Sequence, residues 1–224
     1  MQGFTYSVDL VLCIDATGSM YPIIDEVKKS ALNFYQDLTN TMGQKGKSID
    51  RLRLRTIVYR DYFYDGDKSM EVSDFFTLPD EKEKFAAFVN DIQVSGGGDE
   101  PESGLEALAL AMQSPWSTEG TKRRQVIVLW TDASAHKLEE AAAKRPAGYP
   151  KTMPADFDRL TDMWQGQEYM DPSAKRLVIY GPDAYAWTNI ANFWDEALHL
   201  PSTAGKGMAE LEYSEILDTI ANSI

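Results

Sequence analysis

The stretch Leu10-Val11-Leu12-Cys13-Ile14-Asp15-Ala16-Thr17-Gly18-Ser19 decides the fold of this 224-residue chain. An apolar run ends abruptly in an acid, and two hydroxyl side chains follow in the pattern Asp-x-Thr-x-Ser. A continuous apolar run is typical of a parallel strand that is buried on both faces. In open α/β sheets, ligands bind beyond the carboxyl ends of the strands. The stretch therefore predicts a polar site at the end of a central strand.

Strand-like and helix-like segments alternate along the rest of the chain. The hydrophobic pattern predicts strands over 8–14, 52–59, 72–78, 126–130, 177–180 and 197–200, and helices near 23–42, 85–92, 105–112, 157–164, 185–193 and 211–220. The Asp65-Gly66 turn predicts that the second and third strands form an antiparallel hairpin. We therefore expect a doubly wound, mainly parallel six-stranded α/β sheet with one antiparallel edge strand and helices on both faces.

The length fits one domain over residues 1–224, with an irregular insertion at about 138–174. Four prolines punctuate the insertion, which begins soon after the strand that ends before Asp132. It carries large apolar side chains that either pack onto the domain itself or join the site face as a docking surface, namely Tyr149, Phe157, Met163, Trp164 and Tyr169.

The chain is acidic, with 22 Lys and Arg against 35 Asp and Glu and a formal net charge of −13. This charge argues against binding to nucleic acid and to an anionic membrane surface. Cys13 is the single cysteine, so no intrachain disulfide can form. No basic-then-apolar leader opens the chain, and no run of 18 apolar residues occurs. We expect a cytoplasmic protein with neither nucleic acid nor membrane as partner.

Three acids occupy comparable places at the predicted strand ends. Asp15 follows the first strand, Asp99 lies in a glycine-rich loop, and Asp132 follows the strand over 126–130. Two unit charges about 5 Å apart repel by roughly 3 kcal/mol at an effective dielectric constant of ~20. A divalent cation would remove that repulsion, and carboxylate and hydroxyl oxygens are ligands that suit Mg²⁺ or Mn²⁺.

Four segments of the chain resemble the von Willebrand factor A domain: Asp15-Ala16-Thr17-Gly18-Ser19-Met20, Tyr59-Arg60-Asp61, the loop over 96–102 and Asp132-Ala133. They look most like intracellular A domains of α-kinase-type and bacterial proteins. The resemblance implies a metal-ion-dependent adhesion site with Mg²⁺ or Mn²⁺ held by Asp15, Thr17, Ser19, Asp99 and Asp132. It also implies a non-enzymatic module that binds a protein partner of unknown identity, in a bacterial regulatory, stress or defence assembly.

Asp99 departs from the family pattern, because adhesion-type domains carry a threonine there. We align it with that threonine because Gly104 follows five residues later. An additional anionic ligand should tighten cation binding and leave the metal a weaker acceptor for a partner's carboxylate. Alternatively, Asp99 caps the helix that begins near Pro101.

Other interpretations of the site remain open. A phosphotransferase of the haloacid dehalogenase type also places an Asp nucleophile after its first strand, but it needs a second acid where this chain has Thr17. A scaffold with an empty metal site is a third possibility. Arg60-Asp61 is either a surface ion pair or a support beneath the site loops, and His136 either faces the site or lies exposed in a loop.

Overall fold

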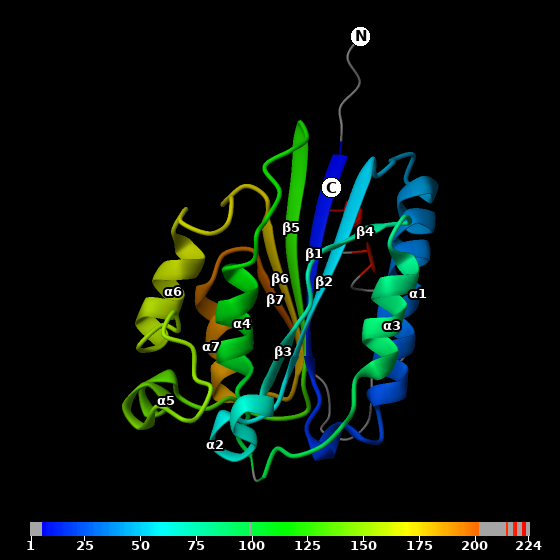
Figure 1. Ribbon diagram of the computed structural model, residues 1–224. Helices are drawn as coiled ribbons and strands as arrows, with labels where there is room; N and C mark the ends of the chain where they lie inside the picture. Colours follow the sequence, from blue (N-terminus) through cyan, green and yellow to red (C-terminus); the bar gives the residue numbers. More distant parts are fainter. Residues whose placement is uncertain (1–5, 99, 202–213, 215–216, 219–220, 223–224) are drawn as a thin grey trace.

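The fold is a mixed sheet with helices on both faces (Figure 1). The computed structural model describes residues 6–98, 100–201, 214, 217–218 and 221–222. The sheet has seven strands in the order β3-β2-β1-β5-β6-β7, and β4 also pairs with β2. The strands are β1 (Tyr6–Asp15), β2 (Arg51–Tyr59), β3 (Met70–Val72), β4 (Phe76–Leu78), β5 (Lys122–Trp130), β6 (Lys175–Gly181) and β7 (Ala197–Pro201).

Strand β1 lies in the middle of the sheet, parallel to both of its neighbours. Its last residues pair with the last residues of those strands, Asp15 with Tyr59 of β2 and Ile14 with Trp130 of β5. This register brings the loops that follow β1, β2 and β5 to one edge of the sheet. The predicted doubly wound, mainly parallel architecture is confirmed.

The antiparallel edge consists of two short strands where the sequence pattern predicts one. Both β3 and β4 pair antiparallel with β2, and residues 73–75 separate the two strands. The Ser73 hydroxyl accepts a hydrogen bond from the Thr56 backbone N–H over 2.9 Å, and the Ser73 N–H donates to the Thr56 carbonyl over 2.9 Å. These local bonds divide the predicted strand, which brings the sheet to seven strands.

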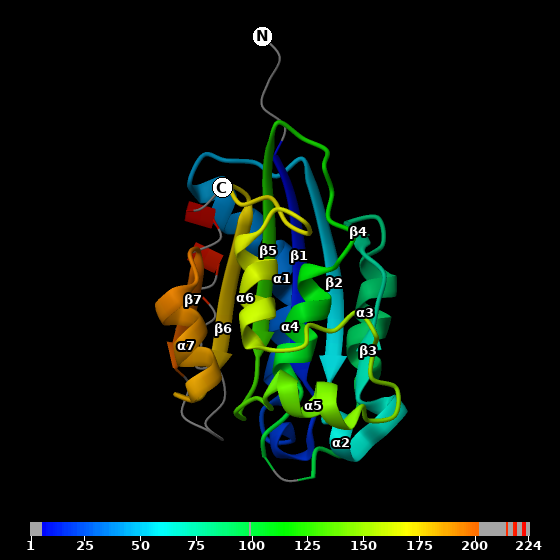
Figure 2. The ribbon, with the colours of Figure 1, turned by 90° about the vertical axis from the view of Figure 1, so that its left-hand side faces the viewer.

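The helices cover both faces of the sheet: α1 and α3 lie on one face, and α4, α6 and α7 lie on the other (Figures 1 and 2). Their bounds are α1 (Ile24–Gln44), α2 (Tyr62–Asp65), α3 (Lys82–Asp91), α4 (Gly104–Met112), α5 (Leu138–Lys144), α6 (Phe157–Gln165) and α7 (Tyr185–Phe193), with short 3₁₀ turns η1 (Gly18–Met20) and η2 (Gly66–Lys68). The helix predicted near 211–220 falls largely outside the described residues.

The apolar run of β1 divides between two cores because alternate side chains of a strand point to opposite faces. Leu10 and Leu12 join the cluster that contains Phe34 of α1, while Val11 joins the cluster that contains Leu108 of α4. All of these side chains are fully buried. Burial on both faces explains why β1 reads as a continuous apolar run, and it fixes the position of Asp15 at the strand's end.

The predicted insertion contains α5 and α6 and is packed against the rest of the chain. Met163 and Trp164 are buried, and the Trp164 ring stacks on Trp194 with centroids 5.5 Å apart. The Tyr149 hydroxyl donates to Oε1 of Glu106 over 3.2 Å. These contacts favour packing onto the chain's own core over a docking role for these side chains. The description of 1–224 as one domain with an insertion stays a prediction.

Within the described part of the chain, no helix is both long enough and apolar enough to pass through a lipid bilayer.

Candidate functional site

Asp15 ends β1 as a fully buried carboxylate whose two oxygens both accept hydrogen bonds. Oδ1 accepts from the Thr17 backbone N–H over 2.9 Å and from the Thr17 hydroxyl over 2.7 Å. Oδ2 accepts from the hydroxyl of Thr131, which follows β5, over 2.7 Å. Burial raises the pKa of Asp15 to about 6, and these hydrogen bonds oppose the shift.

Two more of the predicted site residues extend this network to the loop after β5. The Thr17 and Ser19 hydroxyl oxygens lie 3.1 Å apart, and the Ser19 hydroxyl donates to Oδ1 of Asp132 over 2.9 Å. Burial also raises the pKa of Asp132. The structure therefore brings Asp15, Thr17, Ser19 and Asp132 into one hydrogen-bonded chain.

The fifth predicted ligand, Asp99, lies outside the described residues. The glycines before it lie against the loop after β1, since the Gly18 N–H donates to the Gly96 carbonyl over 3.2 Å. Gly97 has a φ of +89°, and a Cβ there would lie 2.7 Å from Cβ of Thr17. Only glycine fits both this backbone conformation and this close approach.

Glu102 is a site residue that the sequence analysis does not single out. It is 4% exposed, and its Oε2 is buried without a hydrogen-bond partner among the described residues. Its backbone pairs with the segment after Asp132, because the Glu102 N–H donates to the Ser134 carbonyl and the Glu102 carbonyl accepts from the His136 N–H. Burial, together with the charges of nearby carboxylates, raises its pKa to about 9.

Glu102 is not apparent from the sequence because an acid just before a helix is ordinarily explained by its favourable interaction with the helix dipole. The glycine run before it signals a loop, but the burial of Glu102 depends on chain segments that are far away in sequence. Glu102 becomes buried only because the loop after β5 packs against it in the folded structure.

Arg60 is a structural support for the loops near the site and is not part of a surface ion pair with Asp61. Its side chain is buried and donates to the carbonyls of Lys68 and Gln93 and to the Glu71 carboxylate. Asp61 instead caps α2 by accepting from the Phe63 N–H over 2.9 Å. The pair is therefore structural and is not a surface ion pair.

His136 is not an exposed loop residue, since its side chain is 14% exposed. Its Nε2 lies 3.1 Å from Oδ1 of Asp61, and its ring meets the Phe63 ring edge-on with centroids 4.6 Å apart. These contacts place His136 beside α2 and the segment that carries Glu102.

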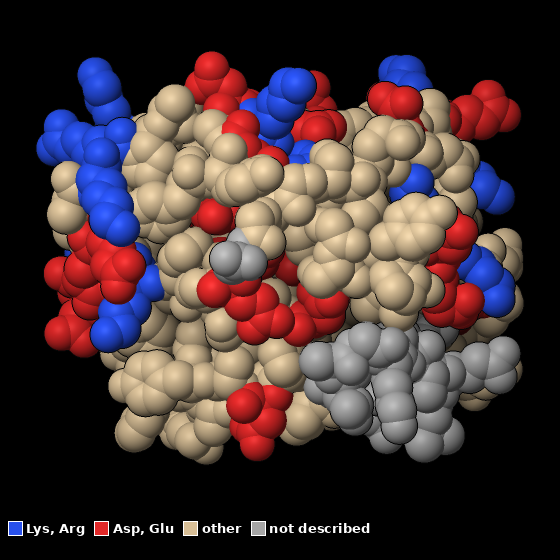
Figure 3. All heavy atoms as spheres, turned by 90° about the horizontal axis from the view of Figure 1, so that it is seen from below, with Lys and Arg blue, Asp and Glu red and all other residues tan. Residues whose placement is uncertain are grey.

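The donor set consists of hard oxygens that suit Mg²⁺ or Mn²⁺. Across the described residues, no three His, Cys, Asp or Glu side chains gather closely enough to hold an ion by themselves. The two buried carboxylates are instead joined by the hydroxyls of Thr17 and Ser19. Figure 3 looks onto this end of the molecule and shows acidic side chains gathered around the middle of the face. The donor set fits a hard divalent cation.

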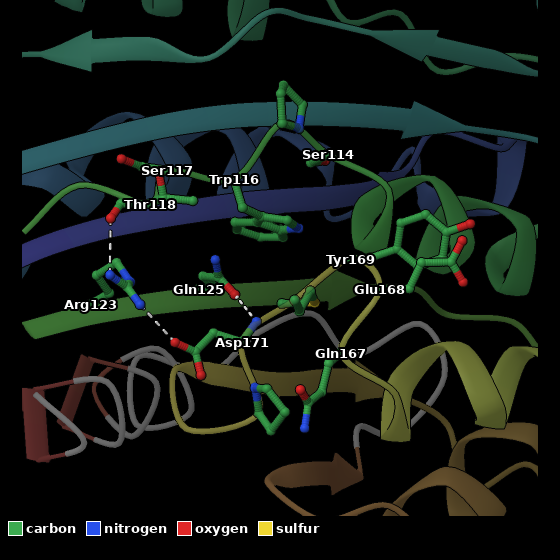
Figure 4. A pocket seen from close by; sticks show the side chains of 13 residues that line it. Ser114, Trp116, Ser117, Thr118, Arg123, Gln125, Gln167, Glu168, Tyr169 and Asp171 are labelled. Carbon is green, nitrogen blue, oxygen red and sulfur yellow. Dashed lines mark hydrogen bonds and ion pairs between the residues drawn. The ribbon is translucent and has the colours of Figure 1, made fainter.

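A separate pocket of about 640 Å³ lies at the start of β5, and its charged side chains are not available to bind a ligand (Figure 4). Its charged side chains already have partners. Arg123 donates to Asp171 over 2.9 Å and to the Thr118 carbonyl over 2.9 Å, while Gln125 accepts from the Asp171 N–H. Dashed lines mark these three contacts in Figure 4.

Comparison with known proteins agrees with this architecture. The sequence profile of the von Willebrand factor A domain matches residues 72–144. The von Willebrand factor domain of the type V pili tip protein Mfa5 from Porphyromonas gingivalis superposes with a TM-score of 0.58, covering 99% of this chain and 97% of that one at 13% identity. The chain is thus similar to von Willebrand factor A domains, in sequence over residues 72–144 and in its fold.

Sequence relatives of this chain are much longer proteins. The alpha-protein kinase vwkA of Dictyostelium discoideum is 28% identical over 158 residues, which is 70% of this chain and 23% of the kinase. A putative ariadne-like RING finger protein, R811, of Acanthamoeba polyphaga mimivirus is 26% identical over 136 residues, 60% of this chain and 12% of that protein. The chain thus spans less than a quarter of the length of either relative.

A further solved structure shares the fold. The pilus adhesin SpaC of Lactobacillus rhamnosus GG has a TM-score of 0.58 at 11% identity, with 99% of this chain and 31% of the adhesin covered. At such low identity the likeness concerns the fold alone.

Proposed function

We propose that this A domain is a non-catalytic protein-interaction module whose binding face is built around a Mg²⁺ or Mn²⁺ ion. The observation that carries the proposal is the hydrogen-bonded chain Asp15–Thr17–Ser19–Asp132, which joins two loops at one edge of the sheet. Asp99 is proposed as an additional ligand. The structural relatives that include a pilus adhesin and a pilus tip protein support a role in protein recognition.

The electrostatics of the site favour a cation. Asp15 is fully buried and Asp132 is 8% exposed, and burial raises the pKa of both carboxyl groups. Burying carboxylates that lack a positively charged partner is costly. A divalent cation would supply that charge, and Thr17 and Ser19 would offer it neutral oxygen ligands beside the two acids.

The geometry argues against the haloacid dehalogenase alternative. The position of the required second acid holds Thr17, whose hydroxyl donates to Asp15. Cys13 is no substitute nucleophile, because burial raises its pKa far above the usual range.

The setting of the module is also part of the proposal. We place it in the cytoplasm, where Cys13 stays a reduced, buried side chain, and in a bacterial regulatory, stress or defence assembly with a protein partner of unknown identity. The activities of the longer relatives are not transferred to it.

Calorimetric titration and thermal melting with Mg²⁺, Mn²⁺ and a chelator test the metal site. A cation at a hundredfold excess over Kd stabilises by about 2.7 kcal/mol, which corresponds to a rise in Tm of about 5–10 °C for a domain of this size. Asp15→Asn should abolish the rise. Asp25→Asn, which removes the same charge from an exposed position in the first turn of α1, should retain it. An identical wild-type melting curve with cation and with chelator contradicts the proposal.

A phosphatase assay tests the class of protein. Wild type should not turn over a generic phosphate ester in the presence of Mg²⁺. Turnover that disappears in Asp15→Asn would establish an enzyme in place of an interaction module.

A further inference from the structure

Glu102 is a buried carboxylate that has no positively charged partner among the described residues. Its Oε2 makes no hydrogen bond within the described part of the chain, although the side chain is only 4% exposed. Burial is the largest cause of its raised pKa, and the next is the negative charge of Asp15. A buried polar atom left unsatisfied is costly, so its persistence calls for a ligand.

The surroundings of Glu102 direct its side chain toward the proposed metal site. A Cβ on Gly97 would lie 2.8 Å from Oε1 of Glu102 and 2.7 Å from Cβ of Thr17, so both side chains lie against Gly97. On the other side, the Glu102 backbone is bonded to Ser134, two residues after Asp132. Glu102 therefore lies between the loops that carry Thr17 and Asp132.

We propose that Glu102 is a positioning residue of the metal centre, whose Oε2 accepts a hydrogen bond from a water molecule bound to the cation. This inference rests on the proposed function and extends it to a carboxylate outside the family's ligand pattern. A bridging water fits the geometry better than direct ligation, because Glu102 does not form a group of three with Asp15 and Asp132 that is close enough to hold an ion directly.

Glu102 would then stabilise the bound cation through this water molecule, in addition to the direct ligands. Partners in the outer shell of a metal orient the ligands and the bound water, and their loss typically costs 10–100-fold in metal affinity. Gly97 is then required because a side chain at this position would fill the space between Thr17 and Glu102.

Glu106 provides a matched control within the same segment. It is also buried, and its Oε2 also has no partner in the described structure, but Oε1 accepts from Tyr149. The charges that shift its pKa come from His136 and Asp61, whereas those that shift the pKa of Glu102 include Asp15 and Asp132. Glu106→Gln thus makes the same chemical change away from the proposed cation.

The experiment compares the affinity of wild type, Glu102→Gln and Glu106→Gln for Mn²⁺ and Mg²⁺ alone. Calorimetry gives the affinity, and water proton relaxation by bound Mn²⁺ reports on the coordinated water. We expect Glu102→Gln to bind 10–100-fold more weakly with changed relaxation, and Glu106→Gln to bind within threefold of wild type. Melting in chelator checks that both variants fold.

The outcomes separate the two claims. If wild type and Glu106→Gln bind the cation and Glu102→Gln binds equally well, the role of Glu102 is overturned and the proposed function stands. If wild type binds no cation, the proposed function fails and this inference fails with it. Should Glu102→Gln not fold, Glu102→Asp decides, because shortening the side chain should weaken binding, and wild-type affinity in that variant overturns the role.

Discussion

The Thr131 hydroxyl donates a hydrogen bond to Oδ2 of Asp15 over 2.7 Å and so joins the end of β5 to the end of β1. The same Thr131 oxygen accepts from the Ala133 N–H over 3.1 Å, which shapes the turn that carries Asp132. One threonine thus fixes both the orientation of the buried acid and the start of the loop beside it.

We predict that Thr131→Val destabilises the protein by about 1–3 kcal/mol, because it leaves Oδ2 of Asp15 buried without its donor. Thr188→Val is the matched control, since the Thr188 hydroxyl also donates to an aspartate, Asp183, but at an exposed site. Its cost should stay within about 0.5–1 kcal/mol. Urea unfolding gives the free energy of unfolding of both variants. Equal losses of stability would show that the hydrogen bond to Asp15 contributes no more than an exposed one.

Gly97→Ala should destabilise the protein and weaken cation binding together. The added Cβ would clash with Thr17 and with Glu102 at a residue whose φ is +89°. Gly43→Ala makes the same change in the last turn of α1, where the new methyl group has no atom within 4 Å, and should be neutral or stabilising by up to about 1 kcal/mol. Denaturation and Mn²⁺ titration of the two variants test this, and unaltered cation affinity in a folded Gly97→Ala variant would contradict it.

The metal-free protein should lose part of its stability as the pH rises from about 4.5 to about 7, through the ionisation of Glu106. Burial raises the pKa of this carboxyl group from 4.5 to about 7, so the folded state holds a proton that the unfolded state has released. The stabilising contribution is complete below the unfolded pKa and is lost as the pH passes the folded one. The slope approaches about 1.4 kcal/mol per pH unit at most.

Glu106→Gln provides the measurement for that prediction, because glutamine does not ionise. Unfolding free energies of wild type and variant in chelator are compared at pH 5 and pH 7. The difference between the two proteins should shift in favour of the variant at pH 7. A difference that is the same at both pH values would mean that Glu106 does not titrate in this range.

Much of the architecture could be predicted because it depends on local patterns. The strand β1 is buried on both faces and therefore appears in the sequence as a continuous apolar run. The helix α1 packs one face against one core, so its apolar residues recur with the helical period. Asp15, Thr17 and Ser19 lie within five residues on one loop, which makes their grouping visible before folding.

What escaped prediction depends on contacts between distant segments. Ser73 divides the edge strand through bonds to Thr56, and the four-residue helix α2 is too short for a periodic signal. In sequence Glu102 is an ordinary acid near a helix N-terminus, and only the backbone hydrogen bonds to Ser134 and His136 hold it in a buried position. Buried acids held by tertiary contacts therefore carry little local signature, although they define the electrostatics of the site.

The departure at Asp99 leads to the last prediction. If Asp99 is a ligand in place of the usual threonine, Asp99→Thr removes one negative charge from the cation's surroundings. The cation should then bind more weakly, while the bound metal becomes a stronger acceptor for an external carboxylate. Mn²⁺ titration measures the first effect, and acetate titrated into the Mn²⁺-loaded proteins measures the second. Asp99→Asn separates charge from shape, because it removes the charge without shortening the side chain. Equal Mn²⁺ affinity in wild type and both variants would place Asp99 outside the metal site and leave it the role of a helix cap.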